Sequence, residues 1–458
     1  MPEITFQHPL NYRQETTVPL FHLLGSGESC TIVGSSSMGK SRLVQFLLRH
    51  DVQQHYLGDA AATTWLVLAD CHRLAELSEW GFFELLLTAL TETASARAEP
   101  AVRNWLNDLR REAITSGNAL LARRHVELAA RVLCQEQGLR LCFICDEFDA
   151  PYRQLPATAL ANLRSLRDAN KYSLCYVLML RDHPGRLRAP ADNEGFYELV
   201  SRSIIGLKPY CEEDARRVIA QIAARRQRVF TPSQEAAMLA LSGGHPGLLV
   251  ALCDLLTDGH EVRAGDDLAA WALAQPQVAE ECRKLWAGLA QDEQMALSRL
   301  AQSVGASYTL RELLALKGII RSAGHAEVDF FSPVFREYVL TQGLLSEQEL
   351  WLDEATATVW VEGRRISDLS RLEYELLRTL YRRLGELCTR EEIIAALYPD
   401  EKLRGDAAIN DNRIDSLIRH LRKAIEPVPS QPRYLLTVRG QGYKLVGTPD
   451  CLAAHGQS

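Results

Sequence analysis

The chain has 458 residues, of which 47% are apolar and 24% are charged, and its formal net charge is −7. This composition is that of ordinary globular domains, and the length predicts three or four of them at roughly 100–150 residues each. The negative charge excludes a protein that coats nucleic acid with its whole surface, although it is compatible with a local basic face. The longest apolar runs, LCFIC and LCYVLML, are far shorter than the ~20 residues of a membrane-spanning helix, so we expect no membrane partner.

The eleven cysteines show no repeating spacing, and the first residues, MPEITFQHPLNYRQ, contain no basic segment followed by an apolar run. We therefore expect no signal peptide, free thiols and a cytoplasmic location. Cys142 and Cys145 form a CxxC pair inside an apolar strand-like run, in which residues three apart face opposite ways. Buried strand cysteines are predicted there in preference to zinc or redox chemistry.

Residues 28–207 alternate short β-rich runs with helical stretches. Apolar runs bounded by polar loops fit a parallel sheet that is buried on both faces, and hence an α/β domain. The predicted strands are residues 30–33, 65–69, 139–145, 174–180 and 203–207.

A phosphate-binding loop follows the first predicted strand. Residues 34–41 read GSSSMGKS, a complete GxxxxGK[ST] pattern, and they open the helical run SRLVQFLLRH. Glycines let the backbone N–H groups curl around phosphates, and the helix N-terminus adds its dipole. We expect Lys40 to reach the β- and γ-phosphates of ATP and Ser41 to hold Mg²⁺, whereas a chance Gly/Ser-rich turn does not explain this strand–loop–helix context. The predicted nucleotide-binding residues of the loop are Gly34, Ser35, Ser36, Ser37, Met38, Gly39, Lys40, Ser41 and Arg42.

An acidic pair ends a later strand, in LRLCFICDEFD. This pattern is typical of a Walker B motif, in which Asp146 orients the magnesium ion and Glu147 polarises the attacking water. A solvated acidic strand end is the alternative, and the preceding P-loop favours the functional interpretation. Arg181 ends the next predicted strand, LCYVLML, where it is either a sensor for the γ-phosphate or a surface arginine.

A helical segment follows at residues 209–275, with helices predicted in EEDARRVIAQIAARR, SQEAAMLALSGG and PGLLVALCDLL. Acidic residues at the start of the first helix and Pro232 at the start of the second are entry signals. The phrase SGGHPGLL at residues 242–249 resembles the GxP motif of STAND-class ATPases, signal-transducing relatives of the AAA+ proteins. In that class the motif lies in a helical lid and contacts nucleotide, which here implies His245 and Pro246. A glycine C-cap followed by a Pro-started helix explains the same residues.

The resemblance to the STAND class covers residues 25–340 and includes FFSPVFREYVL, which looks like the end of the winged helix after the lid. It implies an ASCE-type P-loop core at residues 1–208, a helical lid at 209–275 and a winged-helix-like domain at 276–345. The arginine finger of the class is not identified. Arg164 and Arg167 are candidates for it, and a charged helix face explains them equally well.

The C-terminal part, residues 349–447, has a different pattern and precedes a tail at 448–458. Strand-like ATATVWV and RRISDL precede two helices, a longer helix and a hairpin. From residue 369 to 445 the phrases LSRLEYELLRTLYRRLGELCTREEIIAALYP, INDNRIDSLIRHLRKAI and TVRGQGYKL resemble, in order and spacing, the OmpR/PhoB winged-helix family. The resemblance implies an α+β winged helix-turn-helix domain that binds double-stranded DNA.

Apolar residues recur at helical spacing in RIDSLIRHLRKAI and predict a buried stripe, which leaves a polar face for a major groove. Arg439 stands before Gly440 and Gly442 at a predicted wing tip, from which an arginine can enter a minor groove. Residues 403–444 hold eight Lys or Arg against four Asp or Glu, as phosphate contact requires. A surface helix and hairpin that contact only protein are the alternative. The predicted DNA-binding residues are Arg413, Ser416, Arg419, His420, Arg422, Lys423, Arg439 and Tyr443.

Two features depart from the common use of this family. No receiver domain precedes this C-terminal winged-helix domain, residues 349–447, which we call the reader. Aspartyl phosphorylation is therefore not the implied switch. His420 stands where the family often has arginine. The segment PDEKLRGDA, at residues 399–407, corresponds to one that touches RNA polymerase in some members, or it is a solvated loop.

These motifs favour an ATP-dependent, sequence-specific transcription regulator in which a slow ATPase acts as a timer, with ATP and Mg²⁺ as cofactors. Nucleotide state is expected to alter self-association or DNA presentation. The alternative is a DNA-remodelling or loading ATPase, or a defence-type STAND sensor, in which the winged helix is a tether. Repeat-specific binding supports regulation, and DNA-stimulated hydrolysis with weak sequence preference supports loading.

Overall fold

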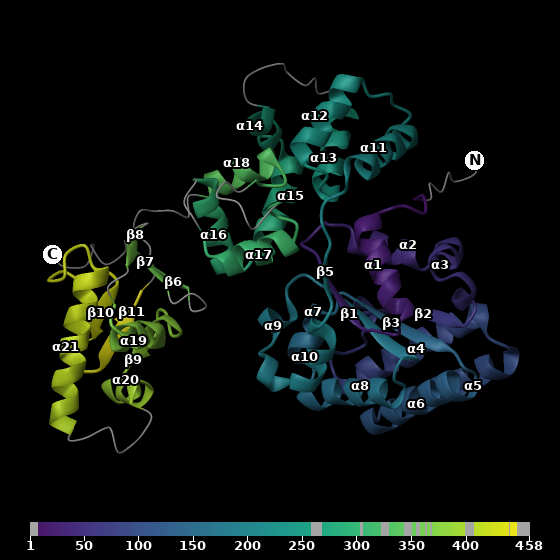
Figure 1. The fold of residues 1–458 in the computed structure, drawn as a ribbon, viewed down its shortest axis with the longest axis horizontal. Helices are drawn as coiled ribbons and strands as arrows, with labels where there is room; N and C mark the ends of the chain where they lie inside the picture. Colours follow the sequence, from purple (N-terminus) through teal and green to yellow (C-terminus); the bar gives the residue numbers. More distant parts are fainter. Residues whose placement is uncertain are drawn as a thin grey trace. The chain divides into compact units, whose positions relative to one another are not determined.

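The structure is a computed structural model, and it describes residues 8–257, 268–302, 306–321, 329–342, 350–353, 358–361, 364–366, 369–398, 407–438 and 440–446. The chain divides into two compact units (Figure 1). The first comprises Met1–Glu293 with Arg311–Thr341, and the second comprises Gln294–Leu310 with Gln342–Ser458. The predicted middle domain, 276–345, is therefore divided between the two units.

A five-stranded parallel sheet forms the centre of the first unit. Its strands are β1 Cys30–Val33, β2 Thr64–Asp70, β3 Arg140–Asp146, β4 Leu174–Leu180 and β5 Ile204–Gly206. Their order is β2-β3-β4-β1-β5, and each agrees with its predicted range to within one residue at either end. β4 lies between the strand that leads into the P-loop and the strand that ends in the acidic pair, which confirms the predicted ASCE-type α/β core.

Helices cover both faces of this sheet (Figure 1). One face packs in a large apolar core against α4 Glu79–Arg97, α6 Ala119–Arg131, α8 Ala157–Ala169 and α10 Glu194–Ser201. α5 Pro100–Ser116 packs on α4 and α6. The other face carries α1 Gln14–Gly25, α2 Lys40–Leu47 and α3 His50–Leu57. All seven residues of β4 are buried as a result, as expected of a parallel sheet covered on both sides.

Short elements complete the core. α7 Asp149–Gln154 follows β3, and α9 Pro184–Leu187 follows β4. The remaining turns are the 3₁₀ segments Gly58–Ala61, Cys71–Arg73 and Pro190–Asp192 and the π-turn Val132–Glu136. Cys142 and Cys145 are both fully buried free thiols in β3, as predicted, and burial raises the pKa of each.

The helices predicted for the lid segment are α11 Glu212–Arg226, α12 Pro232–Ser242 and α13 Pro246–Thr257, which pack on one another. Pro232 opens α12 behind a capping box made by Thr231 and Gln234, which confirms the predicted helix start. The following helices are α14 Leu268–Leu273, α15 Pro276–Ala287, α16 Gln291–Ala301, α17 Tyr308–Leu316 and α18 Pro333–Thr341. An isolated antiparallel bridge joins Ile320 to Phe330.

A buried ionic cluster joins the segment after β4 to the middle helices of the first unit. The Lys317 ammonium, 1% exposed, lies 2.6 and 2.8 Å from the two carboxylate oxygens of the fully buried Glu293 and 3.0 Å from Asp182. Arg186 donates two hydrogen bonds to Asp292, at 2.6 and 2.9 Å. Buried charges of this kind are tolerated only when they are paired, so the cluster fixes how these segments pack.

The second unit contains the C-terminal reader. Its elements are β6 Leu350–Asp353, β7 Thr358–Val361, β8 Arg364–Ile366, α19 Arg371–Tyr381, β9 Leu387–Cys388, α20 Arg390–Leu397, α21 Ala407–Ile425, β10 Leu435–Val438 and β11 Gly442–Leu445. They form an antiparallel sheet β6-β7-β8, three helices and a second sheet β10-β11-β9. β6 was not among the predicted strands. The hairpin β10–β11 was predicted, and Val438 pairs with Gly442 at its end.

The three helices of the reader share one apolar core with both of its sheets. The predicted stripe of α21 is confirmed, because Ile414, Ile418, Leu421 and Ile425 are buried and Leu417 packs against them. Capping boxes begin α19 and α20. Within the described parts of both units, no helix combines the length and apolarity that crossing a lipid bilayer requires.

Candidate nucleotide-binding and DNA-binding sites

The P-loop curls between β1 and α2 as its sequence predicts. Ser37 and Gly39 have positive φ angles, 57° and 86°, and α2 begins at Lys40 directly after this bend. The Lys40 ammonium is buried inside the curl and donates a 2.8 Å hydrogen bond to the Gly34 carbonyl. Burial lowers the pKa of Lys40, and the nearby carboxylates of the β3 end oppose that shift. The side-chain nitrogen of Lys40 therefore lies at the inner surface of the loop, near the acidic end of β3.

A cavity of about 340 Å³ opens over this loop. Its lining combines P-loop backbone and side chains with one acidic residue of the β3 end and with residues of the lid and α15. The lining residues are Ser37, Met38, Gly39, Lys40, Ser41, Arg42, Glu147, Pro246, Gly247, Val250 and Glu281. Six of the nine predicted P-loop residues thus line one cavity with Pro246 and the predicted general base, whereas Gly34, Ser35 and Ser36 are not among its lining residues.

The residues present fit a nucleoside triphosphate with Mg²⁺. The side-chain oxygen of Ser35 is buried in the loop and has no hydrogen-bond partner in the described part of the chain. Ser41, which is exposed at the cavity, offers a hydroxyl, and Asp146 offers a carboxylate whose charge acts on Lys40. Hard oxygen donors of this kind are those that Mg²⁺ prefers.

The acidic pair sits at the carboxyl end of β3. Asp146 is 7% exposed, and burial raises its pKa. Its Oδ1 accepts the backbone N–H of Glu147 at 3.0 Å, and Glu147 has a left-handed backbone with φ 51°. A left-handed non-glycine residue is uncommon and is typical of functional sites. The bend directs the Glu147 side chain into the cavity over the P-loop.

Arg181 follows β4 beside this acidic pair. Its guanidinium donates a 2.7 Å hydrogen bond to Glu147, and its backbone N–H donates to Asp149 at 2.9 Å. The predicted sensor residue is therefore adjacent to the predicted base and paired with it. Its side chain is 49% exposed, and it is not among the residues that line the cavity over the P-loop.

The lid motif also reaches the P-loop. His245 is fully buried; its Nε2 lies 3.3 Å from the Ser36 carbonyl, and its Nδ1 accepts the N–H of Leu248 at 3.2 Å. This pair of bonds requires a neutral imidazole, and burial lowers the pKa of His245 to about 4. Pro246 lines the cavity and begins α13, after Gly243 has ended α12 with a positive φ. The glycine C-cap and the Pro-started helix of the alternative interpretation are therefore present, and nucleotide contact by His245 and Pro246 stays a prediction.

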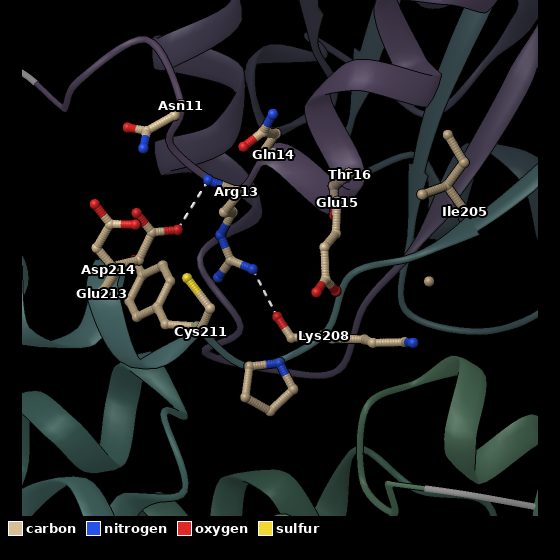
Figure 2. Close-up of a pocket in the computed structure, with 13 residues that line it drawn as sticks. Asn11, Arg13, Gln14, Glu15, Thr16, Ile205, Lys208, Cys211, Glu213 and Asp214 are labelled. Carbon is tan, nitrogen blue, oxygen red and sulfur yellow. Dashed lines mark hydrogen bonds between the residues drawn. The ribbon is translucent and has the colours of Figure 1, made fainter.

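Arg13 is a residue of this site that sequence reasoning missed. Its guanidinium donates to the Met38 carbonyl in the P-loop and to the Lys208 carbonyl after β5, both at 2.6 Å. Its backbone N–H donates to Asp214 of α11 at 2.9 Å (Figure 2). The guanidinium also lies 4.3 Å from the ring centre of Tyr210. Arg13 thus ties the P-loop to the hinge between core and lid.

Figure 2 shows the cavity that opens on the other side of Arg13, about 390 Å³ in volume. It lies between the N-terminal residues 11–16 and the segment 205–214, and its rim carries Glu15, Lys208 and the exposed thiol of Cys211. The only sequence signal for this contact is an arginine at a helix start shortly before the P-loop strand. A single sequence does not distinguish that arginine from a surface residue.

The two arginine-finger candidates lie on α8. Arg164 pairs with Asp168 at 2.7 Å, and Arg167 pairs with the same carboxylate at 3.2 Å. Both also line a cavity with Lys171 and Arg202, away from the P-loop residues. These contacts are those of the charged helix face that was the alternative interpretation.

One face of α21 in the reader is polar and exposed. Arg413, Arg419, His420 and Lys423 are exposed, and Ser416 is half-buried. His420 lies 3.4 Å from Glu373 of α19. These five predicted residues share the side of the helix opposite its buried stripe, which is the geometry that a groove-reading helix needs.

The other predicted contacts have roles inside the reader or fall outside the described residues. Arg422 donates to the Leu435 carbonyl at 2.7 Å and to the Thr437 hydroxyl at 2.7 Å, so it joins α21 to the wing. Tyr443 is 4% exposed, and its hydroxyl donates to Asp415 at 2.7 Å. Burial raises the pKa of Tyr443 to about 12. Arg439 lies outside the described residues, as do most of residues 399–407.

Arg390 completes a contact that orients α21. Its guanidinium lies 2.6 Å from the Asp415 carboxylate and 3.1 Å from the Tyr443 hydroxyl. Hydrogen bonds from Tyr443 and Arg390 lower the pKa of Asp415, although partial burial opposes them. α20, α21 and β11 are thus joined through one carboxylate, which sets the orientation of the exposed face.

Residues 363–445 match the family "Transcriptional regulatory protein, C terminal". Among curated proteins, Protein PetR of Rhodobacter capsulatus is 42% identical over 84 residues, 18% of this chain and 35% of PetR. Sensory transduction protein RegX3 of Mycobacterium tuberculosis is 30% identical over 142 residues, 31% of this chain and 55% of RegX3. The chain therefore spans about a third to a half of the length of these relatives. The match confirms the predicted OmpR/PhoB type of the reader.

Among solved structures, the Walker-type ATPase PABY2304 of Pyrococcus abyssi is similar over 71% of this chain and 95% of its own, at 17% identity and a TM-score of 0.44. The ORC2 protein of Aeropyrum pernix in its ADP form is similar over 78% of this chain and 90% of its own, at 15% identity and a TM-score of 0.42. The geometry of the P-loop, rather than these likenesses, is the basis for the nucleotide site.

Proposed function

We propose that the chain is an ATP-controlled, sequence-specific DNA-binding transcription regulator. The observation that carries the proposal is the combination of a complete P-loop cavity in the first unit with a transcription-regulator DNA-binding domain in the second. The nucleotide bound in the cavity can change, and DNA binding by the reader is the activity that such a change can affect.

In the nucleotide site, Lys40 supplies positive charge to the phosphates, and the backbone of residues 34–39 surrounds them. Arg42, at the cavity wall, adds a second cation. His245 holds the lid against the loop through the Ser36 carbonyl, and Pro246 lines the cavity. ATP is the nucleotide that we assign to this cavity, on the P-loop and acidic-pair chemistry.

Ser41 and Asp146 are the proposed Mg²⁺ ligands, the latter through water. When bound, the ion neutralises phosphate charge. Glu147 is the proposed general base, because its carboxylate lines the cavity and can accept a proton from water. Arg181 occupies that carboxylate in the present structure, which favours slow hydrolysis and hence a timer.

In the reader, we propose that Arg413, Ser416, Arg419, His420 and Lys423 face the major groove. Their exposure and their shared side of α21 support this assignment. Arg439 remains the proposed minor-groove contact of the wing. We assign Arg422 and Tyr443 to orienting the helix and wing, because their polar groups bond within the reader. Contact with RNA polymerase through residues 399–407 and nucleotide-dependent self-association remain parts of the proposal.

The experiment that tests the function is a footprint of the full chain on genomic fragments with and without ATP and Mg²⁺. We expect protection of a short repeated sequence whose affinity or occupancy changes with ATP, and no such change for Lys40→Ala. A footprint of the parent protein that is the same with and without ATP would refute ATP control. Weak, sequence-independent protection together with DNA-stimulated hydrolysis would instead favour a loading or remodelling ATPase.

A further inference from the structure

Glu281 brings a negative charge into a cavity that is otherwise suited to anions. It belongs to α15, and it lines the cavity over the P-loop together with Lys40, Arg42 and Glu147. Of the residues named so far for nucleotide binding, none lies on α15. The contribution of this helix to the cavity is therefore a separate feature of the structure.

α15 lies directly against the P-loop and the lid motif. A side-chain carbon placed on Gly247 would come within 2.3 Å of Glu281 Oε2, and one placed on Gly288, after α15, would come within 3.0 Å of the Ser36 hydroxyl. Glycine at position 247 is what lets the carboxylate approach the cavity this closely. The end of α15 also touches the loop that is expected to hold phosphate.

Only half of the Glu281 carboxylate is compensated. Oε1 lies 2.6 Å from the ammonium of Lys284, one turn along the same helix. Oε2 is buried and has no hydrogen-bond partner in the described part of the chain. The side chain as a whole is 15% exposed. A buried carboxylate oxygen without a partner is costly, and it raises the local negative potential.

Phosphates that enter this cavity would meet that potential. Lys40 and Arg42 attract them, whereas Glu147 and Glu281 repel them. Glu147 is already paired with Arg181, and the buried imidazole of His245 is neutral. Both carboxylates of the cavity wall have one cationic partner, and Glu281 differs from Glu147 in its buried Oε2, which has no hydrogen-bond partner among the described residues.

We propose that Glu281 is a specificity-determining residue that opposes ATP more than ADP, so that ATP favours an arrangement in which α15 has moved away from the P-loop. This inference rests on the proposed nucleotide function. The physical reason is differential affinity: the γ-phosphate adds negative charge, and a ligand shifts a conformational equilibrium only by what it binds differently in the two states. Withdrawal of Glu281 lets the phosphates keep Lys40 and Arg42 without the opposing charge.

Calorimetric titration of the full chain with Mg·ATP and with Mg·ADP tests the proposal. Glu281→Gln keeps the shape of the side chain and removes its charge. Two like charges a few ångströms apart near a protein surface repel by enough for a change of roughly ten-fold in affinity. We therefore expect the ATP affinity of Glu281→Gln to rise about that much, and the ADP affinity to rise less.

Two further variants sharpen the result. Glu280→Gln is the matched control, because Glu280 lies on the same helix, pairs with Arg283 and does not line the cavity. We expect it to leave both affinities unchanged. Lys284→Met removes the neutralising ammonium, so it should weaken ATP binding, and it should do so less when Glu281 is already glutamine.

Hydrogen exchange of α15 amides is the readout of movement. In the parent chain, ATP should increase exchange in Pro276–Ala287 more than ADP does, and Glu281→Gln should reduce that difference. The proposal would be overturned if Glu281→Gln raised the affinities for ATP and ADP equally. It would also be overturned if the variant bound ATP more weakly, because Glu281 would then be a favourable contact. Absence of nucleotide binding by the parent chain would instead refute the nucleotide site itself.

Discussion

Replacement of Lys40 by alanine is the most direct test of the nucleotide site. The lysine side chain is 6% exposed, and its ammonium lies inside the P-loop curl, 2.8 Å from the Gly34 carbonyl. A unit charge about 4 Å from a phosphate oxygen contributes about 4 kcal/mol at an effective dielectric constant of about 20. The carboxylates of Asp146, Glu147 and Asp149 act on the same ammonium and reduce its net contribution. We expect a loss of roughly 2–4 kcal/mol, which is about a thirty- to thousand-fold weaker Kd.

Isothermal titration of the full chain with Mg·ATP measures this loss. The matched control is Lys171→Ala, since Lys171 lies in a different cavity, beside Tyr172 and Arg202. Thermal unfolding of the variant should stay close to that of the parent chain, because the Lys40 ammonium hydrogen-bonds only one carbonyl among the described residues. An affinity within three-fold of the parent value would show that the P-loop does not bind phosphate in the expected way.

Three other predictions concern the base, the lid and the reader. Glu147→Gln should keep ATP affinity and slow hydrolysis by roughly 10²–10⁴-fold, because an amide does not accept the proton; normal turnover would place the base elsewhere. The pKa of His245 is lowered from 6.5 to about 4 by burial, so the unfolded state binds the proton more readily and stability falls as the pH drops from about 6.5 toward 4. Denaturant unfolding measures the decrease in the free energy of unfolding over this pH range, and we expect that decrease to be about 3 kcal/mol smaller for His245→Asn than for the parent chain. Equal decreases in the two proteins would contradict a neutral imidazole at His245. Arg419→Ala should lower the slope of log affinity against log salt by about one unit, with Arg378→Ala, which pairs with Glu375, as the control; an unchanged slope would remove this position from the DNA interface.

The sheet and the P-loop followed from local patterns. Each strand of the core is an apolar run, because both of its faces are covered, and such runs are visible in the sequence without knowledge of their neighbours. The P-loop is likewise a continuous segment whose glycine and lysine positions carry the function. β6 was missed because its sequence, LWLD, is short and precedes residues with no clear alternation.

Contacts between distant segments did not follow from the sequence. Arg13 meets Met38 across 25 positions, and nothing in either residue type predicts the pairing. Arg422 and Tyr443 are polar residues in a basic helix and hairpin, so their types suggested DNA contact. Their hydrogen bonds to Leu435 and Asp415 depend on how the hairpin packs on α21, which only the tertiary structure specifies.

The ionic cluster around Lys317 limits where the chain can be cut. A fragment that stops after the lid, near residue 275, keeps Asp182 and Arg186 but loses Lys317, Asp292 and Glu293. Asp182 would then lose the buried ammonium of Lys317, and Arg186 would lose its bidentate partner Asp292. Of this cluster, the fragment would keep the ion pair between Asp182 and Arg186, at 3.5 Å. We therefore expect a fragment that ends near residue 275 to be less stable than one that extends to Thr341, where the last helix of the first unit ends.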